Sequence, residues 1–393
     1  MRILFVADGR SPITQQWLHY FIEQKHEVHL ASTFACEPQA GLASWQHTPV
    51  AYSGAVTGET NTAASGLRSL LPTGLRTTLR NLAGPLTLPR AASGLESVIN
   101  QVKPQLVHAL RIPYEGMLAA AALEGSQLPL LLSVWGNDFT LHARSTPLIA
   151  AATRRALRRA NGLLADTQRD LRLAQQWSLP ANTPTMAVPG NGGVRSDIFH
   201  PAKQPAPKPH LINPRGLRAY VRNEVFFKAI ALVVQQVPDL HVECPAMHGE
   251  PQAEAWVRQH NLQSHVTLLP KLAPAELAEA YRRAQLMVSP STHDGTPNTL
   301  LEAMACGLLP VAGDLDSIRE WVMPGENGLL VDPNNAAALA AAILRGLNDA
   351  GLRSHAAAYN TTLIAERADY YSGMRRAEAF YQATAGVAGT LGR

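Results

Sequence analysis

The chain has 393 residues, of which 46% are hydrophobic and 16% are charged, and its formal net charge is +4. At about 100–200 residues per domain this length predicts two domains, and the hydrophobic content excludes a disordered or low-complexity chain. The three cysteines, Cys36, Cys244 and Cys306, are too widely spaced for a disulfide framework or a zinc cluster, which indicates a reducing compartment. We find no signal-peptide pattern and no apolar run long enough to cross a membrane, and we therefore expect a cytoplasmic protein.

The first half of the chain alternates short apolar runs with amphipathic stretches. The apolar runs cover residues 3–7, 28–31, 106–109, 130–134, 162–165 and 186–188. Each run has the length of a buried strand and is too short for a helix. Strands that alternate with helices pair in parallel through right-handed crossovers, so we expect an α/β fold with a doubly wound sheet.

Glycine and proline are enriched from residue 189 to residue 209, which is typical of a linker. The alternation then resumes, with apolar runs at residues 211–213, 240–244, 266–268, 286–289 and 309–312. We therefore expect an N-terminal domain over residues 1–200 and a C-terminal domain over residues 201–370, both Rossmann-like. Two such domains joined by a hinge would bind ligands in a cleft between the carboxyl ends of their sheets.

The most informative motif lies in residues 289–312. A strand ends at its start, a polar loop that contains glycine follows over residues 291–297, and a helix is predicted to begin near Asn298, a good N-cap, and to end at Gly307, a good C-cap. The N-terminus of a helix carries backbone amides and a positive dipole end that suit a phosphate. Glu302, one turn into the helix, is placed to accept hydrogen bonds from a vicinal diol such as ribose.

This motif resembles the donor-binding segment of the retaining GT-B glycosyltransferases of glycosyltransferase family 4. The family signature has two acidic residues separated by seven others, followed by Ala-Met-Ala-x-Gly and then Pro-Val; here the acidic pair is Asp294 and Glu302. The family usually has glutamate at the first position, so Asp294 is a departure. The resemblance implies that Glu302 binds the nucleotide ribose and that Asp294 contacts the donor sugar. It also implies that the sugar and the diphosphate lie along the backbone of Gly295, Thr296, Pro297, Asn298 and Thr299.

The family also places an arginine after the first strand of the C-terminal domain and a basic residue at the start of the next helix. Arg215 and Arg222 match these positions best, and Arg218 and Lys228 are alternatives. Two cations suit this chemistry because a departing nucleoside diphosphate develops negative charge on its phosphate oxygens. Ordinary surface arginines on a loop remain the other interpretation.

Two weaker signals follow in the C-terminal half. Leu272 occupies a place where the family lines the pocket for the nucleotide base. The glycine that is usual after the strand at residues 240–244 is absent, so the base itself is not predicted. Asp314-Leu315-Asp316 has the Asp-x-Asp form that binds a metal in the other main glycosyltransferase fold. Its position after a strand favours a loop role instead, and we expect neither a metal nor a cofactor.

The N-terminal half supplies candidate residues after two strands. Gly9, Arg10 and Ser11 match the turn that faces the donor phosphate and the acceptor in the family, although a plain strand-to-helix turn is an alternative. This turn lacks the Gly-x-Gly-x-x-Gly pattern of dinucleotide-binding dehydrogenases. Trp135 stands where relatives often carry histidine; it can stack on a sugar but cannot move a proton. Asp138 is the best candidate for a catalytic carboxylate on the acceptor side, with a helix N-cap as its alternative role.

One stretch of the N-terminal half, between Glu59 and Glu96, contains arginines and no acidic residue. The arginines are Arg68, Arg76, Arg80 and Arg90. They form either an ordinary basic face or a surface for an anionic or lipid-linked acceptor, or for the inner face of a membrane. We do not expect a nucleic acid, because basic and aromatic residues are not interleaved.

We therefore predict a GT-B enzyme whose two Rossmann-like domains face each other across a cleft. It would move a hexose-type sugar from a UDP- or GDP-linked donor to an acceptor hydroxyl, and the resemblance implies retention of the anomeric configuration, no metal and a role in cell-envelope or polysaccharide biosynthesis. By the same resemblance, residues 371–393 form a helix that packs back on the N-terminal domain. A sugar-nucleotide epimerase on the same fold, or an inactive partner that only binds the nucleotide sugar, remain alternatives.

Overall fold

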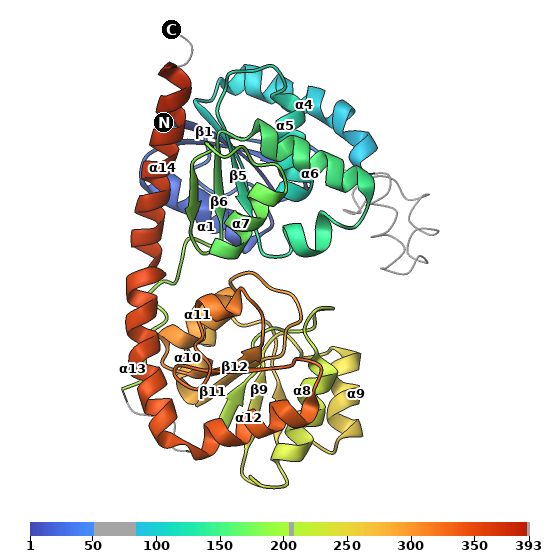
Figure 1. Ribbon diagram of the computed structural model, residues 1–393, viewed down its shortest axis with the longest axis vertical. Coiled ribbons are helices and arrows are strands. Elements are labelled where there is room, and N and C mark those ends of the chain that lie inside the picture. Colours follow the sequence, from blue (N-terminus) through green and yellow to red (C-terminus); the bar gives the residue numbers. More distant parts are fainter. Residues whose placement is uncertain (51–83, 204–207, 391–393) are drawn as a thin grey trace. The chain divides into compact units, whose positions relative to one another are not determined.

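The computed structural model describes residues 1–50, 84–203 and 208–390. The chain divides into two compact units, which we describe separately (Figure 1). The first unit contains Met1–Gly192 together with the chain from Met374 on, and the second contains Gly193–Gly373. The first division therefore falls inside the glycine- and proline-rich stretch noted above.

Among the described residues of the first unit, seven strands form one parallel sheet in the order β3-β2-β1-β4-β5-β6-β7. The strands are β1 (Arg2–Ala7), β2 (Glu27–Ser32), β3 (Ser44–His47), β4 (Leu106–Ala109), β5 (Leu130–Val134), β6 (Gly162–Ala165) and β7 (Thr185–Ala187). Every strand predicted for this half is present to within one residue at each end. The edge strand β3 was not predicted, because Ser44-Trp-Gln-His47 is not an apolar run.

Helices cover both faces of the first sheet. They are α1 (Pro12–Glu23), α4 (Leu88–Val102), α5 (Met117–Ala122), α6 (Pro147–Arg159), α7 (Gln168–Gln176) and most of α14 (Tyr370–Thr390), with short helical segments η2 (Gly84–Thr87), η3 (Ile112–Gly116) and η4 (Asp138–His142). Successive side chains of a strand point to opposite faces. Leu4 and Val6 of β1 accordingly belong to the core with α4, α5 and α6, whereas Phe5 meets Phe21 of α1 and Tyr381 of α14 on the other face.

The described second unit has six parallel strands in the order β10-β9-β8-β11-β12-β13. They are β8 (His210–Ile212), β9 (His241–Cys244), β10 (Val266–Leu268), β11 (Leu286–Ser289), β12 (Leu309–Gly313) and β13 (Leu329–Val331). The helices are α8 (Asn223–Val233), α9 (Pro251–Gln259), α10 (Pro274–Arg283), α11 (Asn298–Ala305), α12 (Ala336–Asn348), α13 (Ala350–Arg367) and the short η5 (Ile318–Glu320). Two apolar clusters fill the two faces, and in both units the predicted alternation and parallel pairing are confirmed.

Helix α11 begins where predicted but is capped differently. Its N-cap is Pro297, in extended conformation and without a side-chain cap, and Asn298 is the first helical residue. The prediction that Asn298 caps the helix was therefore wrong; its Oδ1 atom is buried and makes no hydrogen bond. At the other end Gly307, with φ +82°, follows the last turn, as glycine commonly does in the left-handed region after a helix.

Among the described residues, no helix combines enough length with enough apolar character to cross a membrane.

Candidate functional site

Two loops of the second unit meet at the carboxyl edge of its sheet. One follows β8 and the other follows β11, and these strands are neighbours. The backbone joins the loops directly, because the Thr292 amide donates to the Tyr220 carbonyl at 2.8 Å and Val221 pairs with Ser291 in an isolated bridge. The carboxyl edge of an open parallel sheet is where such folds bind ligands.

A buried ion pair links the two loops. Arg215 Nη2 lies 2.5 Å from Asp294 Oδ2, and only 9% and 12% of the two side chains are exposed. Arg215 Nη1 lies 3.4 Å from the Thr299 hydroxyl at the start of α11. The Nε atom of Arg215 is buried and makes no hydrogen bond. The guanidinium is thus fixed in place by a carboxylate, and one of its buried donors is unused.

Glu302 lies one turn into α11, beside this ion pair. Burial raises the pKa of its carboxyl to about 7, and the Tyr281 hydroxyl and the Arg215 guanidinium oppose this shift. The Tyr281 hydroxyl also donates to the Thr299 carbonyl at 3.2 Å. Near neutral pH Glu302 therefore titrates, which an exposed glutamate would not do.

Two buried asparagines hold the arginine loop in shape. The Asn213 side chain accepts a hydrogen bond from the Arg215 amide at 3.3 Å and donates to Asn223 Oδ1 at 3.2 Å. Asn223 in turn donates to the Gly216 carbonyl at 3.2 Å. Gly216 has φ +62°, a conformation that glycine adopts without strain. Sequence reasoning missed both asparagines, and their signal is their position directly after β8 and at the start of α8.

Residues that follow β12 also hold the loop after β11 in place. Ser317 donates to the Asp294 carbonyl at 2.8 Å, and the Trp321 indole donates to the Thr296 hydroxyl at 3.1 Å. A Cβ atom on Gly313 would lie 2.1 Å from the Ser291 carbonyl oxygen, so only glycine allows the backbones to approach this closely. Asp294 is therefore presented by a rigid loop.

The other predicted donor-side residues have different positions. Gly295 and Pro297 are buried residues of the loop before α11. Leu272 packs against the apolar cluster that includes the buried side chains of α11. Arg222 is exposed, and its Nε atom donates to Asn334 Oδ1 at 2.9 Å. The Arg222 guanidinium also donates to the Ala219 carbonyl at 3.4 Å. These partners differ from those of Arg215, which pairs with Asp294.

The Asp-x-Asp stretch has the loop role that the sequence favoured. Asp314 forms an exposed, bidentate ion pair with Arg319, at 2.6 and 2.7 Å. This contact uses both oxygens of the carboxylate.

The carboxyl edge of the first sheet carries a second buried carboxylate. Asp138 is fully buried, and its Oδ1 atom accepts a hydrogen bond from Arg111 Nε at 3.0 Å. Its Oδ2 atom accepts from the Trp135 amide at 3.1 Å. The Arg111 guanidinium also lies 5.8 Å from the Trp135 ring. Asp138 thus positions Arg111 and Trp135. Arg111, which lies two residues after the end of β4, is a candidate residue that sequence reasoning missed.

The turn after β1 places its three predicted residues in distinct environments. Gly9 is buried, and a Cβ atom there would come within 2.4 Å of Cys36 Sγ. Arg10 is exposed; both oxygens of Asp8 accept its hydrogen bonds, at 3.0 and 2.9 Å, and its guanidinium lies 3.8 Å from the centre of the Phe34 ring. Ser11 precedes α1 as its N-cap without a side-chain hydrogen bond.

The predicted basic surface is described only in part. Arg90 is exposed on α4, and Arg68, Arg76 and Arg80 lie outside the described residues.

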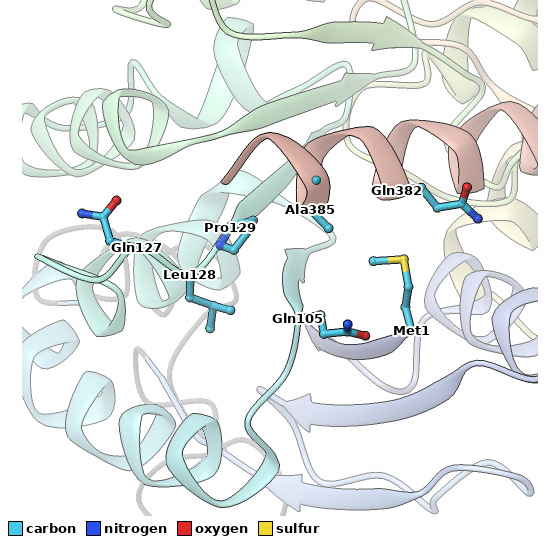
Figure 2. A pocket seen from close by; sticks show the side chains of 8 residues that line it. Met1, Gln105, Gln127, Leu128, Pro129, Gln382 and Ala385 are labelled. Carbon is cyan, nitrogen blue, oxygen red and sulfur yellow. The ribbon is translucent and has the colours of Figure 1, made fainter. Parts of the chain in front are cut away.

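A cavity of about 610 Å³ lies at the other end of the first unit's sheet (Figure 2). It is formed where β1, β4 and β5 begin and where α14 passes. Its lining residues are Met1, Gln105, Gln127, Leu128, Pro129, Gln382, Ala385 and Gly386. None of the predicted site residues lines it, so we do not assign the candidate site to this cavity.

The sequence matches two protein families. The family described as "Glycosyl transferase 4-like domain" matches residues 9–190, and the family described as "Glycosyl transferases group 1" matches residues 216–349. The D-inositol 3-phosphate glycosyltransferase of Thermobispora bispora is 28% identical over 236 residues, which are 53% of this chain and 54% of that protein. The uncharacterized glycosyltransferase MJ1178 of Methanocaldococcus jannaschii is 35% identical over 100 residues, 25% of this chain and 28% of that protein. The matches therefore span about half the length, or less, of these curated relatives.

Solved structures with the same architecture cover almost the whole chain. Sucrose-phosphate synthase from Thermosynechococcus elongatus has a TM-score of 0.76 at 17% identity, and covers 98% of this chain and 99% of that one. HepE from Anabaena, solved in complex with UDP, has a TM-score of 0.73 at 16% identity, and covers 98% and 100%. At this level of identity the likeness concerns the fold, and it confirms the predicted GT-B class.

Proposed function

Because the chain belongs to the group 1 glycosyltransferases, we propose that it transfers a hexose-type sugar from a nucleoside diphosphate donor to an acceptor hydroxyl, with retention of the anomeric configuration and without a metal ion. In this proposal the second unit binds the donor and the first unit binds the acceptor.

The observation that carries the proposal is the buried Arg215–Asp294 pair at the N-terminus of α11. Departure of a nucleoside diphosphate places negative charge on the phosphate oxygens. A guanidinium already fixed in a low-dielectric site stabilises that charge with little reorganisation, and the helix N-terminus adds to the effect. Arg215 thus supplies positive charge at the leaving group without a metal.

Donor binding would add to this pair. The diphosphate would approach Arg215, which Asp294 keeps oriented, and the Asp294 carboxylate would also accept hydrogen bonds from the sugar hydroxyls. Glu302 would accept hydrogen bonds from the ribose, for which its ionised form is the better acceptor. The departing phosphate would take the acceptor proton, which agrees with the use of both Asp138 oxygens by Arg111 and Trp135.

Uracil is the base that we propose first, so the donor would be a UDP-sugar. HepE, which has the same fold, was also solved with UDP-glucose and with UDP and glucose. For the acceptor, we propose a molecule that carries an anionic group. Two features support this: the half-exposed Arg111 held by Asp138, and the names of relatives that act on inositol 3-phosphate.

A panel of UDP- and GDP-sugars tests the proposal. Thermal shifts identify the donor that binds. NMR of the products, formed in the presence of EDTA, then shows where the sugar is attached and its anomeric configuration. Transfer to an added acceptor with the anomeric configuration retained is the expected result. Isomerisation of the free donor would instead identify an epimerase, and tight binding without turnover would identify an inactive binding protein.

A further inference from the structure

Three potential metal ligands lie together near the amino ends of two strands in the second sheet. The candidate site lies at the opposite, carboxyl ends of the strands. His210 is the first residue of β8, His241 is the first residue of β9, and the two are partners in the parallel register. Glu243 lies two residues beyond His241, so its side chain is on the same face of the strand. The ligand atoms of the three side chains lie within 4.8 Å of one another.

The histidine on β8 is buried with an unsatisfied polar atom. Only 8% of His210 is exposed, and the same holds for Glu243. His210 Nε2 is buried and makes no hydrogen bond; Glu243 Oε1, at 3.8 Å, is too far away for one. A buried polar atom without a partner costs free energy, so its position calls for a ligand.

We propose that His210, His241 and Glu243 bind one divalent transition-metal ion, with Zn²⁺ as the best match. Zinc binds imidazole nitrogens and carboxylate oxygens at about 2.0–2.2 Å, so that neighbouring ligands of a tetrahedral ion lie roughly 3.3–3.5 Å apart. The 3.8 Å between His210 Nε2 and Glu243 Oε1 is close to this spacing. Two imidazoles and one carboxylate suit zinc better than magnesium or calcium, which prefer oxygen ligands. A fourth position is left for water.

The charge around the cluster decides how tightly the ion is held. Arg283 Nη2 lies 3.1 Å from both oxygens of Glu243, and about half of the Arg283 side chain is exposed. This guanidinium competes with a metal for the carboxylate, but it can swing out to solvent.

The position of the cluster separates it from the transfer chemistry. Arg215 and Asp294 follow the carboxyl ends of β8 and β11, whereas this cluster lies where β8 and β9 begin. The ion would therefore tie two strands together, and the inference does not depend on the proposed function or on metal-independent transfer.

The experiment uses the full chain, stripped with EDTA and desalted. Zn²⁺ is titrated in competition with a chromophoric chelator, and Co²⁺ absorption reports a tetrahedral site. We expect one ion per chain. Removing a ligand in His241→Ala should weaken binding by about 100-fold or more, since even loss of an outer partner costs about 10–100-fold. Arg283→Ala should bind more tightly, by about tenfold, because the competing cation is gone.

Two further variants make the result decisive. His248→Ala removes an exposed histidine of the same segment and should bind like the unaltered chain. Glu243→Gln keeps the side-chain volume, and circular dichroism checks its fold, so loss of the ion there supports the proposal even if His241→Ala unfolds. The absence of a stoichiometric site, or equal binding by Glu243→Gln and the unaltered chain, would overturn it.

Discussion

Each unit has an arginine–aspartate ion pair at the carboxyl edge of its sheet, and the two pairs differ in how far the arginine is buried. In the second unit both Arg215 and Asp294 are largely buried, and the arginine keeps an unused Nε donor. In the first unit the carboxylate of Asp138 is fully buried, whereas 35% of the Arg111 side chain is exposed. Arg215 is therefore fixed in a low-dielectric site. Arg111 is partly exposed to solvent, and the buried Asp138 carboxylate holds it in place.

This difference corresponds to two chemical tasks. A cation that must stabilise charge as it develops acts best when it is already oriented and shielded from water. A cation that recognises one part of an acceptor gains from access and can adapt to different partners. We therefore expect substitutions in the second unit to act on turnover and on nucleotide binding, and those in the first unit to act on the acceptor.

The largest effect is expected at Arg215. Arg215→Ala should lower kcat by about 10²–10³, the range found when one donor to a developing oxyanion is removed. Initial rates at saturating donor measure this. The matched control is Arg258→Ala, which removes an exposed arginine that pairs with Glu254. A loss of less than about threefold at Arg215, or an equal loss in both variants, would contradict the role of the buried pair.

The second effect concerns Glu302 and pH. With a folded pKa of about 7, this carboxyl is protonated at lower pH and binds ribose poorly. The Kd for UDP should therefore fall by up to about tenfold per pH unit as the pH rises towards 7, and then level off. In Glu302→Gln the Kd at pH 8 should be about 10–100-fold higher, and the contribution of this carboxyl to the pH dependence should be lost.

Isothermal titration at pH 6, 7 and 8 checks this prediction. UDP itself titrates in the same range, so the glutamine variant serves as the reference for the ligand. Glu254→Gln, at an exposed position, controls for loss of one charge. If the Kd for UDP changes with pH in the same way in Glu302→Gln and in the unaltered chain, Glu302 does not take part in UDP binding.

A smaller effect, confined to the acceptor, is expected in the first unit. Asp138→Asn keeps the size of the side chain but loses the ion pair with Arg111, and should raise the acceptor KM by about tenfold. The Kd for UDP should not change. Because the two residues act together, Arg111→Ala combined with Asp138→Asn should cost little more than either alone. Additive increases in the acceptor KM, or weaker UDP binding in these variants, would contradict the proposal that the first unit binds only the acceptor.

The smallest effect on activity is expected in the core of the first unit. The buried His108 bonds Ser133 at 2.8 Å and also the Tyr381 hydroxyl of α14. Tyr381→Phe leaves one ring nitrogen of His108 without its partner, at about 1–3 kcal/mol, and should lower Tm by several degrees. Calorimetry measures this, with the exposed Tyr371→Phe as control. Transfer rates at 25 °C should not change.

Much of the fold could be predicted because its strands are buried on both faces. Such strands are continuous apolar runs, and these were found to within a residue. Strand β3 escaped prediction because it is an edge strand whose side chains are only partly buried. Strand β13 is a run of only three residues.

The site residues that belong to one short sequence motif could be predicted. Contacts between residues that are far apart in the sequence could not. Asp294 and Glu302 belong to one short motif, but the contact of Asp294 with Arg215 joins residues 79 positions apart. The Arg222 side chain bonds Asn334, 112 positions later, which no local pattern reveals. Asn298 failed as a cap because Pro297 already supplies the extended backbone that precedes the helix. Arg111 had only a weak signal, its position two residues after the end of β4.

The path of the chain between the units has a practical consequence. Gly193 and Val194 run beside Ala368–Tyr370, where Val194 donates to the Ala368 carbonyl and accepts from the Tyr370 amide. A Cβ atom on Gly193 would lie 2.4 Å from the Ala368 oxygen. The second unit, Gly193–Gly373, is thus one continuous stretch of chain whose two ends pair with each other, and we expect it to fold as an isolated fragment. The first unit is interrupted in sequence, and a fragment that stopped at residue 192 would lose the tyrosine that completes its aromatic core.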